Sequence, residues 1–141
     1  MDETPNRFPD CLPALRDAAR EAGFSMSCDE RTGSLLALLA AARPGGRVLE
    51  LGTGVGEGTV WLLSGMDSAS RLVTVELDGA VQRVAREHLG SDPGVTFVTE
   101  DGGEWLERHD GGPFGSGPGP ALIRQTPPRA GGSCTAPASE R

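Results

Sequence analysis

Residues 47–58, RVLELGTGVGEG, decide the fold of this 141-residue chain. Residues 48–51 are apolar apart from one acid, as expected of a short buried strand. Four glycines follow at alternate positions, and residues 59–63, TVWLL, then begin a helix. A strand, a glycine-rich turn and a helix in this order start a nucleotide-binding crossover unit. Glycine suits such a turn because it takes positive φ and lets a ligand approach the backbone.

The glycine spacing separates two kinds of nucleotide site. A dinucleotide fingerprint needs glycines at relative positions 1, 3 and 6. Counted from Gly52, the sixth residue is Glu57, and counted from Gly54 it is Thr59. Neither is a glycine, so the dinucleotide fingerprint is absent. An NAD(P)-binding Rossmann protein is therefore the least favoured function. The sequence instead contains an acid followed by alternating glycines, at Glu50, Gly52, Gly54 and Gly56.

This pattern of an acid and glycines resembles motif I of the class I S-adenosylmethionine (SAM) methyltransferases. The wider run at residues 32–63, TGSLLALLAAARPGGRVLELGTGVGEGTVWLL, is similar to small-molecule O-methyltransferases, including the catechol O-methyltransferase-like group. The resemblance covers residues 29–106. It implies an α/β, Rossmann-like fold with SAM as the cofactor and a small molecule as the methyl acceptor.

The resemblance also assigns residues to the cofactor. Glu50 would accept hydrogen bonds from loop amides or lie near the amino group of the ligand, and its other interpretation is bracing of the loop. Glu76 follows Gly52 by 24 residues, near the interval of about 20 typical of a ribose-binding acid; its other interpretation is a solvated acid. Asp101 would pair with the adenine amino group. The expected cofactor residues are Glu50, Gly52, Thr53, Gly54, Gly56, Glu76, Leu77, Asp101 and Gly102.

Other positions are carried over more weakly. The joint before the second helix would lie near the methionine end of the cofactor, at Met26, Ser27 and Gly33. Ordinary helix capping by Ser27 or Asp29 explains the same joint equally well.

Hydrophobic periodicity places the remaining elements. Helices are expected from Leu12 to about residue 22 with Asp10 as the cap, at residues 32–43, 56–64 and 79–89, and from residue 104. Strands are expected at residues 71–76 and 95–98. The second helix should bury its leucines at positions 35, 36, 38 and 39, and Asp78 should cap the fourth helix.

Composition excludes several classes of function. The net charge of −7, with no basic stripe, argues against nucleic-acid binding. No run of 18 apolar residues predicts a membrane span, and the acidic, polar start is unlike a secretory signal. Three widely spaced cysteines predict no disulfide framework. A cytoplasmic location is therefore expected.

The composition changes abruptly after residue 110. Residues 111–141 contain seven glycines and six prolines, with one apolar run at residues 121–123. Such a segment is expected to be disordered. Together with the resemblance, this change in composition divides the chain into an N-terminal helical segment at 1–28, a partial SAM-binding domain at 29–110 and a tail at 111–141. The tail suggests a truncated chain or one translated out of frame.

The missing half of the fold limits the expected function. The strand order of the family is 3-2-1-4-5-7-6, and only strands 3, 2 and 1 are recognisable. The first strand would become an open edge and favour self-association. The family's metal ligand and general base lie in the missing half, so no catalytic or metal-binding residue is assigned, and His109 and Asp110 are weak candidates. The expected function is O-methylation of a small molecule; the alternative is a non-catalytic SAM-binding fragment.

Overall fold

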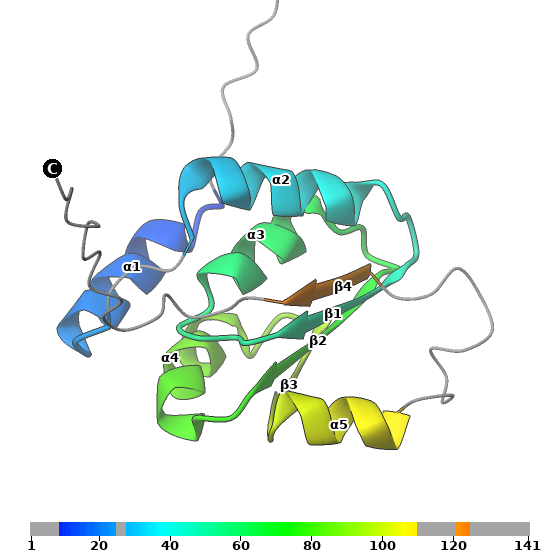
Figure 1. The fold of residues 1–141 in the computed structure, drawn as a ribbon. Helices are drawn as coiled ribbons and strands as arrows, with labels where there is room; N and C mark the ends of the chain where they lie inside the picture. Colours follow the sequence, from blue (N-terminus) through cyan, green and yellow to red (C-terminus); the bar gives the residue numbers. More distant parts are fainter. Residues whose placement is uncertain (1–8, 25–27, 110–120, 125–141) are drawn as a thin grey trace, which may run out of the picture.

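The computed structural model describes residues 9–24, 28–109 and 121–124 of the chain. Helices and strands alternate along most of this part, as Figure 1 shows. The elements are α1 (Leu12–Glu21), α2 (Glu30–Ala41), β1 (Arg47–Leu51), α3 (Glu57–Gly65), β2 (Arg71–Glu76), α4 (Gly79–Leu89), β3 (Val95–Thr99), α5 (Gly102–His109) and β4 (Ala121–Arg124).

The strands form one parallel sheet in the order β3-β2-β1-β4. The predicted arrangement of three strands, 3-2-1, is therefore confirmed. Parallel neighbours need crossover connections, and α3 and α4 supply them between β1 and β2 and between β2 and β3. The carboxyl ends of β1, β2 and β3 consequently meet at one edge of the sheet.

The sheet differs from the prediction at β4. Residues Ala121–Arg124 lie in the segment that was expected to have no structure, yet their backbone pairs with β1 from Val48↔Ala121 to Leu51↔Arg124. The open N–H and C=O groups of β1 explain this pairing, because an unpaired strand edge accepts any extended segment that reaches it. The prediction that β1 is an edge strand is therefore wrong. Self-association through that edge is no longer expected, because β4 occupies it. The domain boundaries at 28 and 110 stay predictions.

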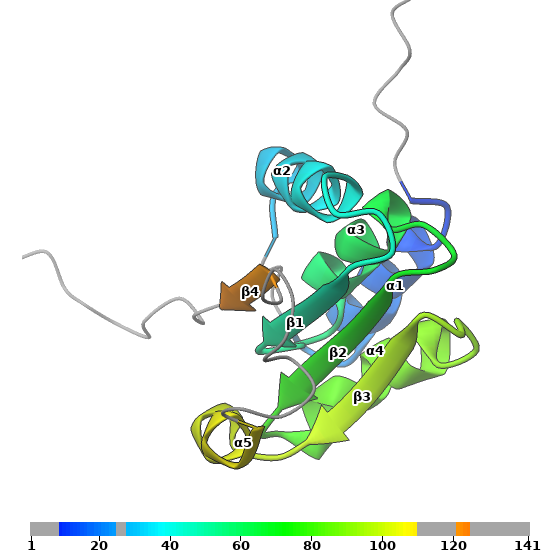
Figure 2. The same ribbon diagram turned by 90° about the vertical axis from the view of Figure 1, so that its right-hand side faces the viewer.

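The sheet is covered on both faces. Figure 2 shows α1 to α4 gathered on one side and α5 on the other. The larger core cluster joins the first four helices to residues such as Val48 and Leu72 of the sheet. Leu49 of β1, which follows Val48, and Val75 of β2 belong to a second cluster, which Trp105 of α5 covers. Alternate strand residues thus face opposite layers, as the pleat of a strand requires.

Helix α2 buries a narrower face than the sequence predicts. It packs chiefly on α3 and buries Gly33, Leu36 and Ala40, at intervals of three and four residues. The expected burial of the other leucines is wrong, because one neighbouring helix covers one stripe of a helical surface. The exposed side chains, at 54%, 66% and 46% of their surface, are Leu35, Leu38 and Leu39.

Three helix starts test the predicted caps. Asp29 accepts a hydrogen bond from the Thr32 N–H, and Asp78 accepts from the N–H groups that open α4, so both caps are confirmed. The predicted cap at Asp10 is wrong. Helix α1 begins after Cys11 with no side-chain cap, because the N–H of Leu12 donates to a backbone carbonyl, that of Pro9, instead.

Candidate functional site

The candidate site lies where β1, β2 and β3 end. The glycine-rich loop at residues 52–56 follows β1, Glu76 ends β2, and Asp101 follows β3 by two residues. The backbone of Glu100 donates to the carbonyl of Glu76, which ties the ends of β2 and β3 together. In open α/β sheets this carboxyl edge is where ligands bind. The topology therefore brings the residues that the resemblance assigns to one edge.

The glycine loop has the backbone that its sequence predicts. Gly52, Gly54 and Gly56 have φ values of 94°, 55° and 98°, in the left-handed region that other residues rarely adopt. A Cβ on Gly56 would also lie 2.7 Å from the Cβ of Ala85 on α4. Among the described residues other than Gly54 and its two chain neighbours, no atom lies within 4 Å of the position that a Cβ on Gly54 would take. The loop is thus packed at one end and open at its centre.

Glu76 points back toward this loop. Its Oε2 accepts a hydrogen bond of 2.8 Å from the N–H of Gly54, and its Oε1 accepts one of 3.1 Å from the N–H of Asp78. The side chain is part-buried, so the carboxylate is fixed in direction without leaving solvent. A carboxylate held beside an open glycine loop has the position expected of an acid that binds ribose hydroxyls.

Glu50 lies beneath the loop, fully buried. Its Oε2 accepts hydrogen bonds from the hydroxyls of Thr59 on α3, at 2.6 Å, and Thr74 on β2, at 2.7 Å. The carboxylate therefore joins the elements on both sides of the loop. These contacts support bracing as the role of Glu50, and contact with a ligand stays a prediction.

A chain of buried hydrogen bonds extends from this carboxylate. The Thr74 hydroxyl uses its one proton on Glu50, so the Thr53 hydroxyl must donate across the 2.6 Å between the two threonine oxygens. Thr53 in turn accepts from the Nε2 of Gln82 at 3.1 Å. Thr53 as a whole residue is 1% exposed, so its described role is within this network, and its contact with a ligand stays a prediction.

Sequence reasoning missed Gln82. The α4 periodicity predicts an apolar buried face, yet this amide is fully buried among β2, β3 and the loop. Its Nε2 also donates to the carbonyl of Val98 at 2.9 Å, and its Oε1 accepts from the hydroxyl of Thr99 at 2.7 Å. Gln82 follows Val81 and lies at helical spacing from the apolar residues that α4 buries. A polar residue at such a position was the sequence signal that could have identified it, because a buried polar group needs hydrogen-bond partners.

The expected adenine-binding segment lies at the same edge. Asp101 is exposed, and its Oδ1 accepts a hydrogen bond of 3.0 Å from the N–H of Glu104 at the start of α5. A Cβ on Gly102 would lie 3.3 Å from the Leu51 side chain, so this backbone runs close to the end of β1. Leu77, beside Glu76, is 68% exposed. Their contacts with adenine stay predictions.

The weaker candidates separate into three groups. Met26, Ser27 and Asp110 lie outside the described residues. Gly33 is buried where α2 meets the Trp61 ring, so its described contact is helix packing. His109 stacks on Trp105 at 3.8 Å between ring centroids, with its Nδ1 2.7 Å from the Trp105 carbonyl oxygen. Trp105 itself packs on the sheet.

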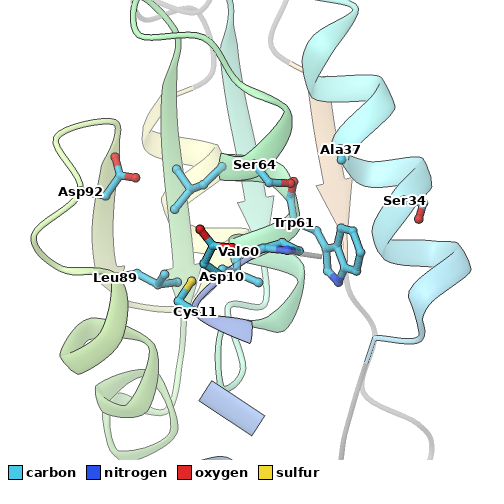
Figure 3. A pocket seen from close by; sticks show the side chains of 11 residues that line it. Asp10, Cys11, Ser34, Ala37, Val60, Trp61, Ser64, Leu89 and Asp92 are labelled. Carbon is cyan, nitrogen blue, oxygen red and sulfur yellow. The ribbon is translucent and has the colours of Figure 1, made fainter. Parts of the chain in front are cut away.

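Two further observations concern metal ligands and a hollow elsewhere in the fold. Within residues 9–24, 28–109 and 121–124, no group of three His, Cys, Asp or Glu side chains is placed to hold a metal ion. A hollow of about 540 Å³ opens between the segment that precedes α1, helices α2 and α3, and the end of α4 (Figure 3). Its walls include Ser64 and Leu89, at the ends of α3 and α4 remote from the glycine loop. The hollow is therefore separate from the candidate site.

Curated relatives of the chain are methyltransferases by name. A protein of Mycobacterium sp. (strain KMS), provisionally named an O-methyltransferase, is 37% identical over 89 residues. The match covers 59% of this chain and 40% of that protein. A relative from Mycolicibacterium smegmatis with a similar name is also 37% identical over 89 residues, which cover 42% of its length. No protein-family profile matches the chain.

Solved structures agree in fold. The O-methyltransferase TomG from Streptomyces achromogenes, in complex with SAM, matches with a TM-score of 0.72 and 26% identity, over 85% of this chain and 55% of TomG. Cofactor-bound Rv0187 from MTB matches with a TM-score of 0.71 and 28% identity, over 86% and 55%. The resemblance to O-methyltransferases is confirmed. The Rossmann-like methyltransferase fold is confirmed with it, and this chain spans about 40% of the curated relatives.

None of the described helices is both long enough and apolar enough to cross a lipid bilayer.

Proposed function

We propose that this chain binds SAM at the carboxyl edge of β1, β2 and β3 and supplies the cofactor site of an O-methyltransferase that acts on a small molecule. The hydrogen bond from the Gly54 N–H to Glu76 carries this proposal. It holds a carboxylate against an open glycine loop, where the two ribose hydroxyls of an adenosine ligand can both donate to it. TomG, which is similar to this chain, was solved with SAM.

The residues present fit SAM. Gly54 leaves open space over the loop, and exposed Leu77 offers an apolar surface beside the ribose-binding acid. SAM carries a positive sulfonium and no phosphate. A nicotinamide dinucleotide would need glycines at relative positions 1, 3 and 6 of the loop, and the sixth positions counted from Gly52 and Gly54 are Glu57 and Thr59. The glycine spacing therefore favours SAM over a nicotinamide dinucleotide.

When bound, SAM supplies an electrophilic methyl group for in-line transfer to a nucleophilic oxygen. The described part of the chain contributes the orientation of the ligand: Glu76 would hold the ribose, the backbone of the glycine loop would contact the methionine portion, and Asp101 would pair with adenine. Such positioning is a large part of what a transferase provides. A small-molecule acceptor and a cytoplasmic location are further parts of this proposal.

Calorimetric titration with SAM and, separately, with NAD tests the cofactor. We expect saturable SAM binding and no NAD binding. Glu76→Gln keeps an acceptor for the Gly54 N–H but loses the charge. It should weaken SAM binding by at least about tenfold, since a hydrogen bond to a charged group contributes about 1.5–3 kcal/mol.

Glu87→Gln is the matched control, because Glu87 is an exposed glutamate near the remote end of α4 whose ion pair with Arg83 spans 3.8 Å. Equal losses in both variants, or tighter binding of NAD than of SAM, would contradict the proposal. Release of S-adenosylhomocysteine with a panel of hydroxylated small molecules distinguishes an active enzyme from a SAM-binding fragment.

A further inference from the structure

A buried ion pair lies at the start of α3. Glu57 is the first residue of this helix, and its side chain is completely buried. Its Oε1 accepts a hydrogen bond of 2.7 Å from the Nε of Arg16 on α1, and its Oε2 accepts one of 3.3 Å from the backbone N–H of Cys28. One carboxylate thus connects α1, the entry to α2 and the glycine loop. Its neighbours in the sequence, Gly56 and Gly58, belong to that loop and its helix.

The charge of Glu57 needs a partner in this position. A carboxylate removed from water is strongly disfavoured unless it is paired, and breaking such a pair leaves an uncompensated buried charge. Arg16 supplies the opposite charge while 26% of its side chain stays exposed. The guanidinium therefore neutralises the buried carboxylate of Glu57 while part of it stays in contact with solvent.

The same position matters for a ligand. The first N–H groups of a helix have no partner inside the helix, and together with the helix dipole they favour negative charge. A negative side chain in the first turn satisfies part of that preference. It also opposes a second anion there, because like charges placed side by side cost several kcal/mol. The net charge at the start of α3 therefore depends on whether Arg16 balances Glu57.

We propose that Arg16 and Glu57 form a positioning pair that sets the charge at the start of α3, so that this end of the site accepts the carboxylate of the ligand's amino-acid portion. This inference rests on the proposed function, in which the methionine portion of SAM contacts the glycine loop, and α3 begins directly after that loop. Arg16 acts through Glu57 and has no direct contact with the ligand in this role. The pair gives the N-terminal helix α1 a part in cofactor recognition.

Two adenosine thioethers separate this role from simple structural support. S-adenosylhomocysteine carries the amino-acid group, and 5′-methylthioadenosine lacks it. We expect Arg16→Met to weaken S-adenosylhomocysteine binding about tenfold or more, and to leave 5′-methylthioadenosine binding within about twofold. Arg16→Lys should retain binding of both ligands, because it keeps the charge.

Further variants keep the test decisive if Arg16→Met folds poorly. Glu57→Gln removes the carboxylate and leaves Arg16 positive, so S-adenosylhomocysteine should bind at least as tightly as it binds the unmodified chain. The double variant Arg16→Met, Glu57→Gln should recover most of the affinity that Arg16→Met loses. Arg20→Met is the surface control, because Arg20 lies on the same helix with a side chain 75% exposed.

The outcomes are distinct. Equal weakening of both ligands by Arg16→Met, or a double variant that shows no recovery, would overturn the positioning role while the proposed function stands. An unmodified chain that binds neither ligand would overturn the proposed function and this role with it. Selective loss of S-adenosylhomocysteine with recovery in the double variant would support both.

Discussion

The hydroxyl of Thr53 lies 2.6 Å from the hydroxyl of Thr74, and this contact joins the glycine loop to the neighbouring strand β2. Thr74 passes the connection on to the buried Glu50, and Gln82 closes it from α4. The loop is therefore held from below by buried side chains that bond to one another. Its geometry should persist without the cofactor.

Thr74→Val tests this connection. The substitution keeps the β-branched shape and removes the hydroxyl, which leaves Thr53 without its acceptor and Glu50 with one donor fewer. We expect the free energy of unfolding to fall by about 1–3 kcal/mol, and the thermal midpoint to fall by at least about 4 °C. Thr96→Val is the control, because Thr96 is exposed on β3. Comparable effects of the two changes in thermal unfolding would show that the hydroxyl network is unimportant.

Gly56→Ala tests the packed end of the loop. An alanine there must adopt φ near 98° and place its Cβ 2.7 Å from that of Ala85. Left-handed strain and overpacking together should destabilise the fold by at least about 2 kcal/mol, measured by urea unfolding. Gly23→Ala is the matched control, with φ of 80° and open space around its Cβ, so it adds strain alone. A smaller effect at position 56 than at position 23 would contradict the contact.

The thiols should be unreactive in the folded chain. Burial, followed by the nearby charge of Glu57, raises the pKa of Cys28 to about 11, and burial also raises the pKa of Cys11. Because the thiolate is the reactive form, a raised pKa slows alkylation at neutral pH. In a chain carrying Cys134→Ser, iodoacetamide at pH 8 should modify both thiols far more slowly than after addition of denaturant. Rapid labelling of Cys28 in the native chain would count against its burial.

Asp67 should make the stability of the fold depend on pH in the acidic range. Hydrogen bonds from the Ser70 hydroxyl, the Gly45 N–H and other backbone N–H groups lower the pKa of Asp67 below its usual value of 3.8. The ionised form is therefore favoured in the folded chain, so its contribution is complete at neutral pH and is lost as the pH falls through the lowered pKa. The difference in thermal midpoint between the unmodified chain and Asp67→Ala should be present at pH 6 and shrink below pH of about 4. A difference that stays constant across this range would refute the assignment.

The sequence predicted the parts of the fold that depend on local pattern. Alternating glycines, an apolar strand and capping acids act over a few residues, so the loop and the caps at Asp29 and Asp78 could be predicted from them. The sheet order 3-2-1 came from the resemblance to the methyltransferase family. Glu76 lies at the loop because the loop and Glu76 stand at the carboxyl ends of neighbouring parallel strands, and its contact with ribose stays a prediction.

Long-range contacts were not visible in the same way. Arg16 and Glu57 are 41 residues apart, and each has the appearance of a surface residue in its own helix. Gln82 occupies a helical position whose burial depends on how α4 meets β2 and β3. The exposed leucines of α2 were misjudged because periodicity marks an apolar face without showing how much of it a neighbour covers. β4 was missed because four residues carry too little pattern outside their pairing with β1.

The position of β4 has a consequence for how the chain folds. Val48 of β1 pairs with Leu72, 24 residues along the chain, on one side, and with Ala121, 73 residues along, on the other. Closing the longer loop costs more chain entropy, and distant pairings form late in folding. We expect β1, β2 and β3 to assemble first and β4 to join last. The edge proposed to bind SAM would then be formed by β1, β2 and β3 before β4 completes the sheet.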